Sequence, residues 1–201
     1  THHHFDHIGG NDDLKKIYGA KIVGFSGDKH RIPNIDIPLQ NNSSWVFGKS
    51  KVRILHIPGH TLGHICFFFE KEKIAFTGDT LFSLGCGRIF EGTYEQMFSS
   101  INKIKKLPKA TKIYCGHEYT FKNAKFCLEH DVENTNLKNK FKKIKELRSK
   151  NLPTIPTTLE DELKCNIFLR CDENELKAKL DMNKLKDSDV FKKIRDLKDR
   201  F

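Results

Sequence analysis

The spacing of hydrophobic residues divides the chain into two parts. In the first part, short apolar or alternating runs bounded by glycine, proline or charged residues predict β-strands. These strands are expected at residues 20–25, 45–48, 51–57, 65–69, 73–77 and 112–115. Apolar residues at helical spacing predict an amphipathic helix at 94–105 and a shorter helix at 14–18. Residues 26–43, which include two prolines, and the glycine-rich segment 84–88 are expected to be irregular.

From about Tyr119 onward the pattern changes and the strand signals stop. Apolar residues now recur at helical spacing between prolines or polar breaks. Helices are expected at residues 121–130, 134–149, 159–164, 173–180 and 190–201. This change predicts two domains, one of mixed strands and helices at 1–118 and one that is entirely helical at 119–201. The predicted fold class is therefore α/β, followed by a smaller all-helical region.

Composition narrows the class of protein. The 201 residues include 16 phenylalanines and are 37% hydrophobic, which is enough to build a buried core. No run of about 18 apolar residues occurs, so we expect no membrane-spanning segment. The six cysteines include no C-x-x-C pair and no spacing typical of a disulfide framework. This favours a reducing compartment, and we expect a cytoplasmic location.

The net charge of +10 leaves two kinds of partner open. A strongly basic protein could bind nucleic acid, or it could bind a small anionic substrate. Much of the excess charge lies in lysine-rich helices such as 139–145, where a solvent-exposed helix face is enough to explain the lysines. Charge by itself does not decide between these partners.

The first seven residues carry the densest group of chemically active side chains. His2, His4, Asp6 and His7 have the H-x-H-x-D-H spacing of a two-metal site. The remnant of a purification tag would explain the histidine run, but it would not explain Asp6 or His7. A regular strand would point His7 away from the other three, because side chains alternate between its faces. We therefore expect a loop that runs into a helix, with two ligand pairs facing two neighbouring ions.

Three later segments share one pattern, in which a predicted strand ends at a glycine that precedes a ligand-type residue. They are Gly59-His60, Gly78-Asp79 and Gly116-His117. Each is weak evidence by itself, because a histidine after a glycine is more often an ordinary loop residue. Together with the first motif they provide five imidazoles and two carboxylates, a donor set that suits two borderline-soft divalent ions.

The seven residues divide into two sets of three and one bridge. The first ion is expected to bind His2, His4 and His60. The second is expected to bind Asp6, His7 and His117. Asp79 can bridge both ions, because a carboxylate has two oxygens. Two ions, two carboxylates and a bridging hydroxide leave a net positive charge, which favours a substrate oxygen that becomes anionic in the transition state.

Hydrolysis is the chemistry that suits such a site best, since metal binding can lower the pKa of water from about 15.7 to about 7. We expect Asp79, Asp6 and His7 to take part in catalysis. The other histidines are expected not to be metal ligands; they are His3, His30, His56, His64 and His130. His64 lies four residues after His60, where it either supports a ligand or has a purely structural role.

Longer segments extend the two-metal pattern; they are residues 1–11, 61–65, 76–82, 85–92, 114–120 and 195–201. With these segments the chain resembles the glyoxalase II family, the hydroxyacylglutathione hydrolases, within the metallo-β-lactamase superfamily. The resemblance runs the whole length of the chain. It implies a four-layer αββα sandwich followed by a smaller helical domain. It also implies two divalent metal ions, with zinc favoured over iron or manganese.

The activity that this resemblance implies is the hydrolysis of S-D-lactoylglutathione to D-lactate and glutathione by a metal-bridging hydroxide, the second step of methylglyoxal detoxification. A thioester suits the site because its leaving group is a thiolate, whose conjugate acid has a pKa of about 8.5. No strong general acid is therefore required. The expected partner is a small glutathione thioester, with no nucleic acid and no membrane, and we expect a monomer.

The same resemblance implies a set of contacts to the glutathione moiety, at Arg88, Phe90, Tyr119, Arg195 and Lys198. Arg195 and Lys198 lie three residues apart on one face of a predicted helix, as a clamp for a carboxylate would require. An ordinary basic helix face is the alternative. Phe90 stands where some family members have tyrosine, which removes one hydroxyl contact worth about 0.5–1.5 kcal/mol.

Family members have a further segment before the first ligand, which supplies strands of the first half of the sandwich. The chain begins at Thr1, within the motif, so we expect this segment and any organellar targeting peptide to be missing. Other enzymes of the superfamily are the alternatives. A nuclease would explain the positive charge. A persulfide dioxygenase would use a single iron, and would not need Asp6, His7 and His117.

Overall fold

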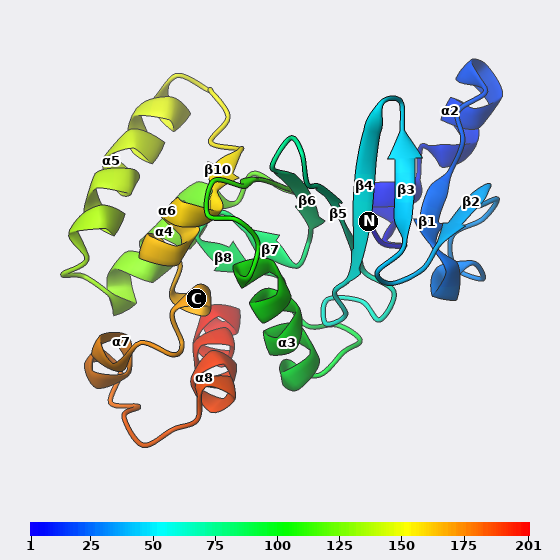
Figure 1. Ribbon diagram of the computed structural model, residues 1–201. Helices are drawn as coiled ribbons and strands as arrows, with labels where there is room; N and C mark the ends of the chain where they lie inside the picture. Colours follow the sequence, from blue (N-terminus) through cyan, green and yellow to red (C-terminus); the bar gives the residue numbers. More distant parts are fainter.

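The computed structural model describes residues 1–201 and is organised around a six-stranded mixed β-sheet (Figure 1). In the order in which they lie side by side, its strands are β10 (Thr157–Thr158), β9 (Lys112–Cys115), β6 (Ile74–Gly78), β5 (Ile65–Phe69), β4 (Ser50–His56) and β3 (Ser44–Phe47). From β3 to β6 the neighbours are antiparallel, whereas β9 lies parallel to β6 and β10 lies antiparallel to β9.

Three strands end at the same edge of this sheet. β4 and β6 both run antiparallel to β5, so they share one direction, and β9 runs parallel to β6. The C-terminal ends of β4, β6 and β9 therefore lie together. His60, Asp79 and His117 follow these three ends within a few residues. Strand direction thus explains why the three predicted ligand segments meet at one edge.

Short elements complete the first part of the chain. They are α1 (Phe5–Ile8), α2 (Asn11–Tyr18), β1 (Val23–Phe25), the 3-10 turn η1 (Ser26–Asp28), β2 (Ile37–Leu39), β7 (Leu81–Phe82) and β8 (Gly85–Cys86). β1 and β2 form a parallel pair that packs on one face of the main sheet, through a small core of Leu39, Val52, Ile54 and Ile65. β7 and β8 form an antiparallel pair just beyond β6.

Helices pack on the other side of the sheet and extend away from it (Figure 1). They are α3 (Tyr94–Lys105), α4 (Thr120–His130), α5 (Thr135–Ser149), α6 (Leu159–Cys165), the 3-10 turn η2 (Ile167–Leu169), α7 (Asn174–Lys179) and α8 (Asp187–Arg200). The main core, a cluster of 29 buried residues, joins the sheet to these helices. α3 begins with a capping box between Thr93 and Gln96, and it buries Met97, Ile101 and Ile104.

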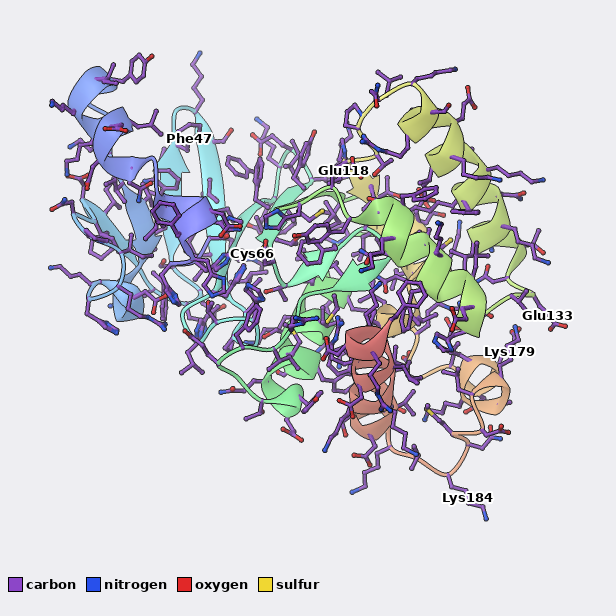
Figure 2. The ribbon with its side chains drawn as sticks, turned by 180° about the vertical axis from the view of Figure 1, so that it is seen from behind. Phe47, Cys66, Glu118, Glu133, Lys179 and Lys184 are labelled. Carbon is purple, nitrogen blue, oxygen red and sulfur yellow. The ribbon has the colours of Figure 1, made fainter.

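The strand and helix regions lie at opposite ends of the molecule. Seen from behind, Phe47 marks the end that carries β3, and Lys184, between α7 and α8, marks the other end (Figure 2). α8 packs beside α3, so the C-terminal helix returns to the middle of the structure (Figure 1). No helix is both long enough and apolar enough to cross a lipid bilayer.

The predicted strands and helices are confirmed to within three residues at each end, but four further strands, β2, β7, β8 and β10, were not predicted. β2 lies within the segment 26–43, and β8 lies within 84–88. β10 lies beyond Tyr119, so the prediction that strands stop there is wrong. These strands have only two or three residues, which is too short for a periodic pattern to show in the sequence. The boundary between 118 and 119 stays a prediction.

Candidate active site

The first predicted motif has the local structure that its spacing requires. Residues 1–4 are irregular, and the backbone N–H of Ile65 donates to the Thr1 carbonyl, which holds this segment beside β5. α1 then begins at Phe5, and the backbone N–H of His7 donates to the His4 carbonyl. His2 and His4 therefore precede the helix, whereas Asp6 and His7 lie within it. The predicted loop that runs into a helix is confirmed.

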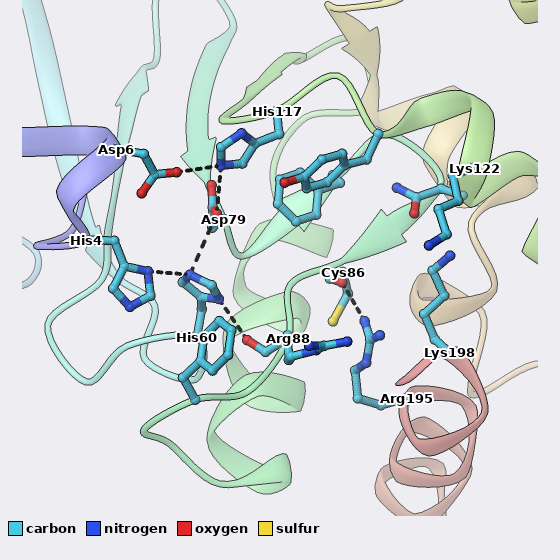
Figure 3. Close-up of a pocket in the computed structure, with 14 residues that line it drawn as sticks. His4, Asp6, His60, Asp79, Cys86, Arg88, His117, Lys122, Arg195 and Lys198 are labelled. Carbon is cyan, nitrogen blue, oxygen red and sulfur yellow. Dashed lines mark hydrogen bonds and ion pairs between the residues drawn. The ribbon is translucent and has the colours of Figure 1, made fainter. Parts of the chain in front are cut away.

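Three imidazoles converge on one point of the site. Nδ1 of His4 lies 3.1 Å from Nε2 of His2 and 3.0 Å from Nε2 of His60. Figure 3 shows the contact between His4 and His60. His2 and His60 are buried, at 1% and 4% exposure, so their ring nitrogens face one another and not water. These are the three residues predicted for the first ion.

A second group forms around His117. Its Nε2 lies 3.2 Å from Oδ2 of Asp6 and 3.2 Å from Oδ2 of Asp79 (Figure 3). Nε2 of His7 lies 3.4 Å from Oδ1 of Asp79. Oδ2 of Asp79 also lies 3.6 Å from Nε2 of His60, which belongs to the first group. The Asp79 carboxylate therefore lies between the two groups, and the structure brings all seven predicted residues together.

The donor atoms of this cluster suit metal ions better than they suit one another. Nδ1 of His60 donates to the Arg88 carbonyl at 2.7 Å, so its Nε2 presents a lone pair to the other donors. Nε2 of His7 and Oδ1 of Asp79 are buried and have no hydrogen-bond partner. Nitrogens bound at about 2.0 Å to a tetrahedral ion lie about 3.3 Å apart, close to the spacings seen here.

The protonation states also suit metal binding. Burial, with help from neighbouring imidazoles, lowers the pKa values of His2 and His60, so both rings are neutral. Burial alone would raise the pKa of Asp79, but the adjacent His7, with His117 and His60, lowers it below its ordinary value. Metal ligands must be neutral imidazoles and ionised carboxylates, and these residues have those forms at neutral pH.

Two of the glycines in the predicted pattern have a clear steric reason. A Cβ on Gly116 would lie 2.2 Å from Oδ1 of Asp79. A Cβ on Gly78 would lie 2.4 Å from Oγ1 of Thr1, and Gly78 also has a φ of +49°, which disfavours other residues. Glycine therefore allows the backbone of two strands to approach the ligand cluster closely.

His64 supports the site without joining it. Its Nε2 accepts a hydrogen bond of 3.0 Å from the backbone N–H of Asp79, and its ring stacks on that of His2 at 4.6 Å. Of the two roles left open by the sequence, the structure favours support of the ligands. His64 is completely buried, so it holds the start of the Asp79 loop in place.

A charged network behind the site was not predicted. Its members are His3, Asp28, Arg31 and Glu91. Arg31 donates to both carboxylates, and the two ring nitrogens of His3 lie 3.3–3.4 Å from the same two groups. The residues come from three separate segments, so no local pattern in the sequence indicates that they all meet.

The ligand cluster lines one end of a pocket of about 790 Å³. Fourteen residues line this pocket: His4, Asp6, His60, Asp79, Phe82, Cys86, Arg88, Phe90, His117, Tyr119, Lys122, Asn123, Arg195 and Lys198. All five residues predicted to contact glutathione are among them. Lys122, from the first turn of α4, was not predicted. Figure 3 shows the cations of α4 and α8 at the end of the pocket away from the imidazoles.

The two residues of the predicted carboxylate clamp have different surroundings. The Arg195 guanidinium is buried, and it donates to the Cys86 carbonyl at 2.6 Å and to Asp199 at 3.0 Å. The ammonium of Lys198 is buried without a hydrogen-bond partner, between the rings of Phe126 and Phe201. Lys198 therefore keeps all its donors for a ligand, whereas Arg195 already uses Nη1 and Nη2 in hydrogen bonds within the protein.

Comparison with known families and proteins agrees with this geometry. Residues 1–117 match the metallo-beta-lactamase superfamily, and residues 118–201 match the hydroxyacylglutathione hydrolase C-terminus. The hydroxyacylglutathione hydrolase of Pelagibacter ubique is 57% identical over 201 residues, which are 100% of this chain and 78% of that protein. The hydroxyacylglutathione hydrolase of Methylococcus capsulatus is 44% identical, with the same two coverages.

Two solved structures share the fold. ETHE1 from Myxococcus xanthus has a TM-score of 0.63 at 21% identity, over 98% of this chain and 66% of that chain. The BLEG-1 B3 metallo-beta-lactamase has a TM-score of 0.61 at 24% identity, over 84% and 74%. The predicted α/β fold with a helical C-terminal region is thus confirmed, and the donor cluster is that of a dinuclear metal site. By its matches along the whole length, the chain belongs to the hydroxyacylglutathione hydrolase, or glyoxalase II, family of the metallo-β-lactamase superfamily.

Proposed function

We propose that this chain hydrolyses the thioester S-D-lactoylglutathione, and related 2-hydroxyacyl thioesters, to a hydroxy acid and glutathione. One observation carries the proposal: a single pocket has metal-type donors at one end and positively charged side chains at the other. The reacting thioester would lie at the donor end, and the anionic tripeptide would extend toward the cations. The names and high identity of the relatives support the same reaction.

The metal assignment follows the two groups of donor atoms. We propose that the first ion is held by His2, His4 and His60. The second is held by Asp6, His7 and His117. Asp79 would serve both ions, since its carboxylate lies beside both groups. When bound, two divalent ions, here proposed to be zinc, polarise the thioester carbonyl and lower the pKa of water. Iron and manganese suit the same donors, so a metal analysis must identify the ions.

The protein's own residues orient the reaction. Tyr119 stacks on His117 at 4.9 Å, and Phe90 contacts His60 edge to face at 5.2 Å. These two rings therefore border the donor cluster, and they would exclude water from the acyl group when a substrate is bound. The thiolate that leaves has a conjugate acid with a pKa of about 8.5, so the pocket needs no strong general acid.

The two alternatives fit the site less well. A persulfide dioxygenase would use one iron, yet Asp6, His7 and His117 form a complete second group of donors. A nuclease would need a long basic surface for phosphates, whereas the cations described here line a pocket of about 790 Å³. A small anionic thioester accounts for both the second donor group and the enclosed cations.

We also propose a monomeric enzyme of a reducing compartment such as the cytoplasm. Both donor groups and the cations of the pocket are supplied by this chain, so the proposed site needs no residue from a second copy. All six cysteines are free, as the sequence analysis predicts for such a compartment.

The proposed function is tested by measuring metal content and thioester hydrolysis on the same purified protein. We expect about two ions per chain and hydrolysis of S-D-lactoylglutathione, followed as loss of the thioester absorbance. An Arg53→Met variant is a matched control, because Arg53 pairs with Glu70 on the exposed side of β4, away from the pocket. A metal-loaded protein that leaves the thioester intact, but consumes oxygen with glutathione persulfide, would contradict the proposal.

A further inference from the structure

We propose that Arg31 is a positioning residue for the metal site, because its guanidinium ties together three separate segments that carry or adjoin the ligands of the first ion. This inference rests on the metal ligands given under the proposed function. Arg31 does not line the pocket. It acts through the carboxylates of Asp28 and Glu91.

The contacts of Arg31 have the geometry of strong ion pairs. Nη1 donates to Oε1 of Glu91 at 2.6 Å, and Nε and Nη2 both donate to Oδ1 of Asp28, at 3.2 and 2.5 Å. The Asp28 side chain is 3% exposed and that of Arg31 is 24% exposed, so water screens these pairs only in part. A guanidinium has donors in a fixed planar fork, and here that fork spans two carboxylates from different segments.

Glu91 connects Arg31 to the segment that carries His60. Its Oε2 accepts a hydrogen bond of 2.8 Å from the backbone N–H of Leu62, two residues after this ligand. The preceding residue, Phe90, donates its backbone N–H to the His60 carbonyl at 3.3 Å. Two consecutive residues thus bind both sides of the His60 turn, and Arg31 fixes the second of them.

His3 connects the same network to the first motif. It lies between the proposed ligands His2 and His4 in the chain. Its Nδ1 lies 3.4 Å from Oδ2 of Asp28, and its Nε2 lies 3.3 Å from Oε1 of Glu91. The ring of His3 is therefore held between the two carboxylates that Arg31 binds. The two carboxylates therefore border the residue that separates His2 from His4 in the chain.

The chain leaves room for Asp28 at one specific position. A Cβ on Gly63 would lie 2.0 Å from Cγ of Asp28, so glycine is required for the carboxylate to lie against this turn. Gly63 lies between Leu62 and His64, which both support the site. The approach of Asp28 thus fixes the turn from a second side. The network thus contacts the segments that carry His2, His4 and His60, and none of its hydrogen bonds or ion pairs involves Asp6, His7 or His117.

The test measures the affinity of each ion by competition with a chelator, on folded protein well below its unfolding temperature. In an Arg31→Met variant we expect the first ion to bind about 10- to 100-fold more weakly, the usual effect of losing a residue that orients metal ligands. The second ion should bind with little change. The KM for the thioester should also change little when metal is in excess, because Arg31 lies outside the pocket.

Two further variants separate positioning from a general loss of stability. The Arg31→Met variant leaves the buried Asp28 carboxylate unpaired. A double variant, Asp28→Asn with Arg31→Met, removes that unpaired charge, and we expect the double variant still to bind the first ion more weakly. Glu91→Gln keeps an oxygen for the Leu62 N–H, and it should lose less affinity than Arg31→Met. Arg53→Met, which breaks an exposed ion pair on β4, should change the affinity for neither ion.

Unchanged affinity for the first ion in a folded Arg31→Met protein would overturn the proposal, whatever happens to its melting temperature. An equal loss of affinity for both ions would also overturn the proposal. The competition measurement does not depend on thioester hydrolysis. A wild-type protein that binds two ions but leaves the thioester intact would therefore contradict the proposed function alone.

Discussion

The two ends of the pocket are built in different ways. At the donor end, residues from the first motif and from three strand ends point at one another, and Nε2 of His7 and Oδ1 of Asp79 have no hydrogen-bond partner. At the cationic end, Arg88 and Arg195 both donate to Asp199, whereas Lys122 and Lys198 form no ion pair. The donor end thus consists of residues that all suit metal binding. The cationic end contains both charges that pair within the protein and charges that are free to bind a ligand.

This difference predicts how each end responds to substitution. Loss of one donor leaves the remaining six unable to hold both ions, so the effect should be close to complete. Loss of one cation leaves the other three in place, so the effect should be partial and should fall on substrate affinity. The catalytic rate therefore reports on the donor end of the pocket, and substrate affinity reports on the cationic end.

Asp79→Ala should have the largest effect. Asp79 contacts both groups of donors, so its removal should lower kcat by more than about 100-fold. That is more than the usual effect of losing a residue that only orients the metal ligands. The metal content should fall, while the far-ultraviolet circular dichroism spectrum stays that of the folded protein. A folded variant with a near-normal rate would show that the carboxylate does not bridge the ions.

Arg195→Ala should affect both substrate affinity and stability. It should raise KM for the glutathione thioester several-fold, about fivefold, with a smaller change in kcat. It should also destabilise the fold by about 1–3 kcal/mol, because the buried Cys86 carbonyl loses its donor. Lys198→Ala should raise KM similarly but cost less stability, since its ammonium has no hydrogen bond to lose.

Thermal unfolding and steady-state kinetics of both variants check this contrast. An unchanged KM in Arg195→Ala, with a lowered melting temperature, would show that Arg195 only supports the pocket wall. An equal loss of stability in Lys198→Ala would show that its packing between Phe126 and Phe201 matters more than its charge.

The donor end could be predicted from the sequence because its signals are local. Four of the seven residues lie within seven positions, and the others each follow a glycine at the end of a strand. The steric need for Gly78 and Gly116 explains why that pattern marks the site. Strand direction explains why the three later ligands lie together, because β4, β6 and β9 run the same way and their C-terminal ends lie at one edge of the sheet.

The cationic end and the supporting network could be predicted only in part. The spacing of Arg195 and Lys198 correctly places both on the pocket side of α8. The partner that occupies Arg195, the Cys86 carbonyl, lies 109 residues away in the chain. Arg31 and Glu91 are 60 residues apart. Contacts of this kind depend on how the elements pack, which periodicity in the sequence does not reveal.

Lys122→Gln should have a smaller effect on the cationic end. Lys122 lines the pocket but is exposed and unpaired, so its removal should raise KM for the glutathione thioester about threefold and leave kcat unchanged. Lys125→Gln is the matched control. It lies one turn further along α4, where its ammonium sits over the Phe121 ring outside the pocket. Equal KM values for the two variants would exclude Lys122 from substrate binding.

An effect of similar size is expected from pH, as a dependence of KM on pH that belongs to the cationic end alone. Burial, with the charge of the neighbouring Arg195, lowers the pKa of Lys198 to about 8. The other ionisable groups that face it are Asp199 from α8, and Lys122 and Cys127 from α4. Below this pKa the ammonium is charged and attracts the substrate; above it the charge is lost. KM should therefore rise as pH increases from 7 to 9, by about threefold.

Initial rates over this range, corrected for spontaneous thioester hydrolysis, measure that rise in KM. In Lys198→Ala the same rise should be absent, because the group that titrates is gone. The donor end should not contribute, since the pKa values of Asp79, His2 and His60 are lowered and these groups keep one protonation state between pH 7 and 9. If KM still rises with pH in Lys198→Ala, the group that titrates is a different one. The pH dependence would then no longer distinguish the cationic end from the donor end.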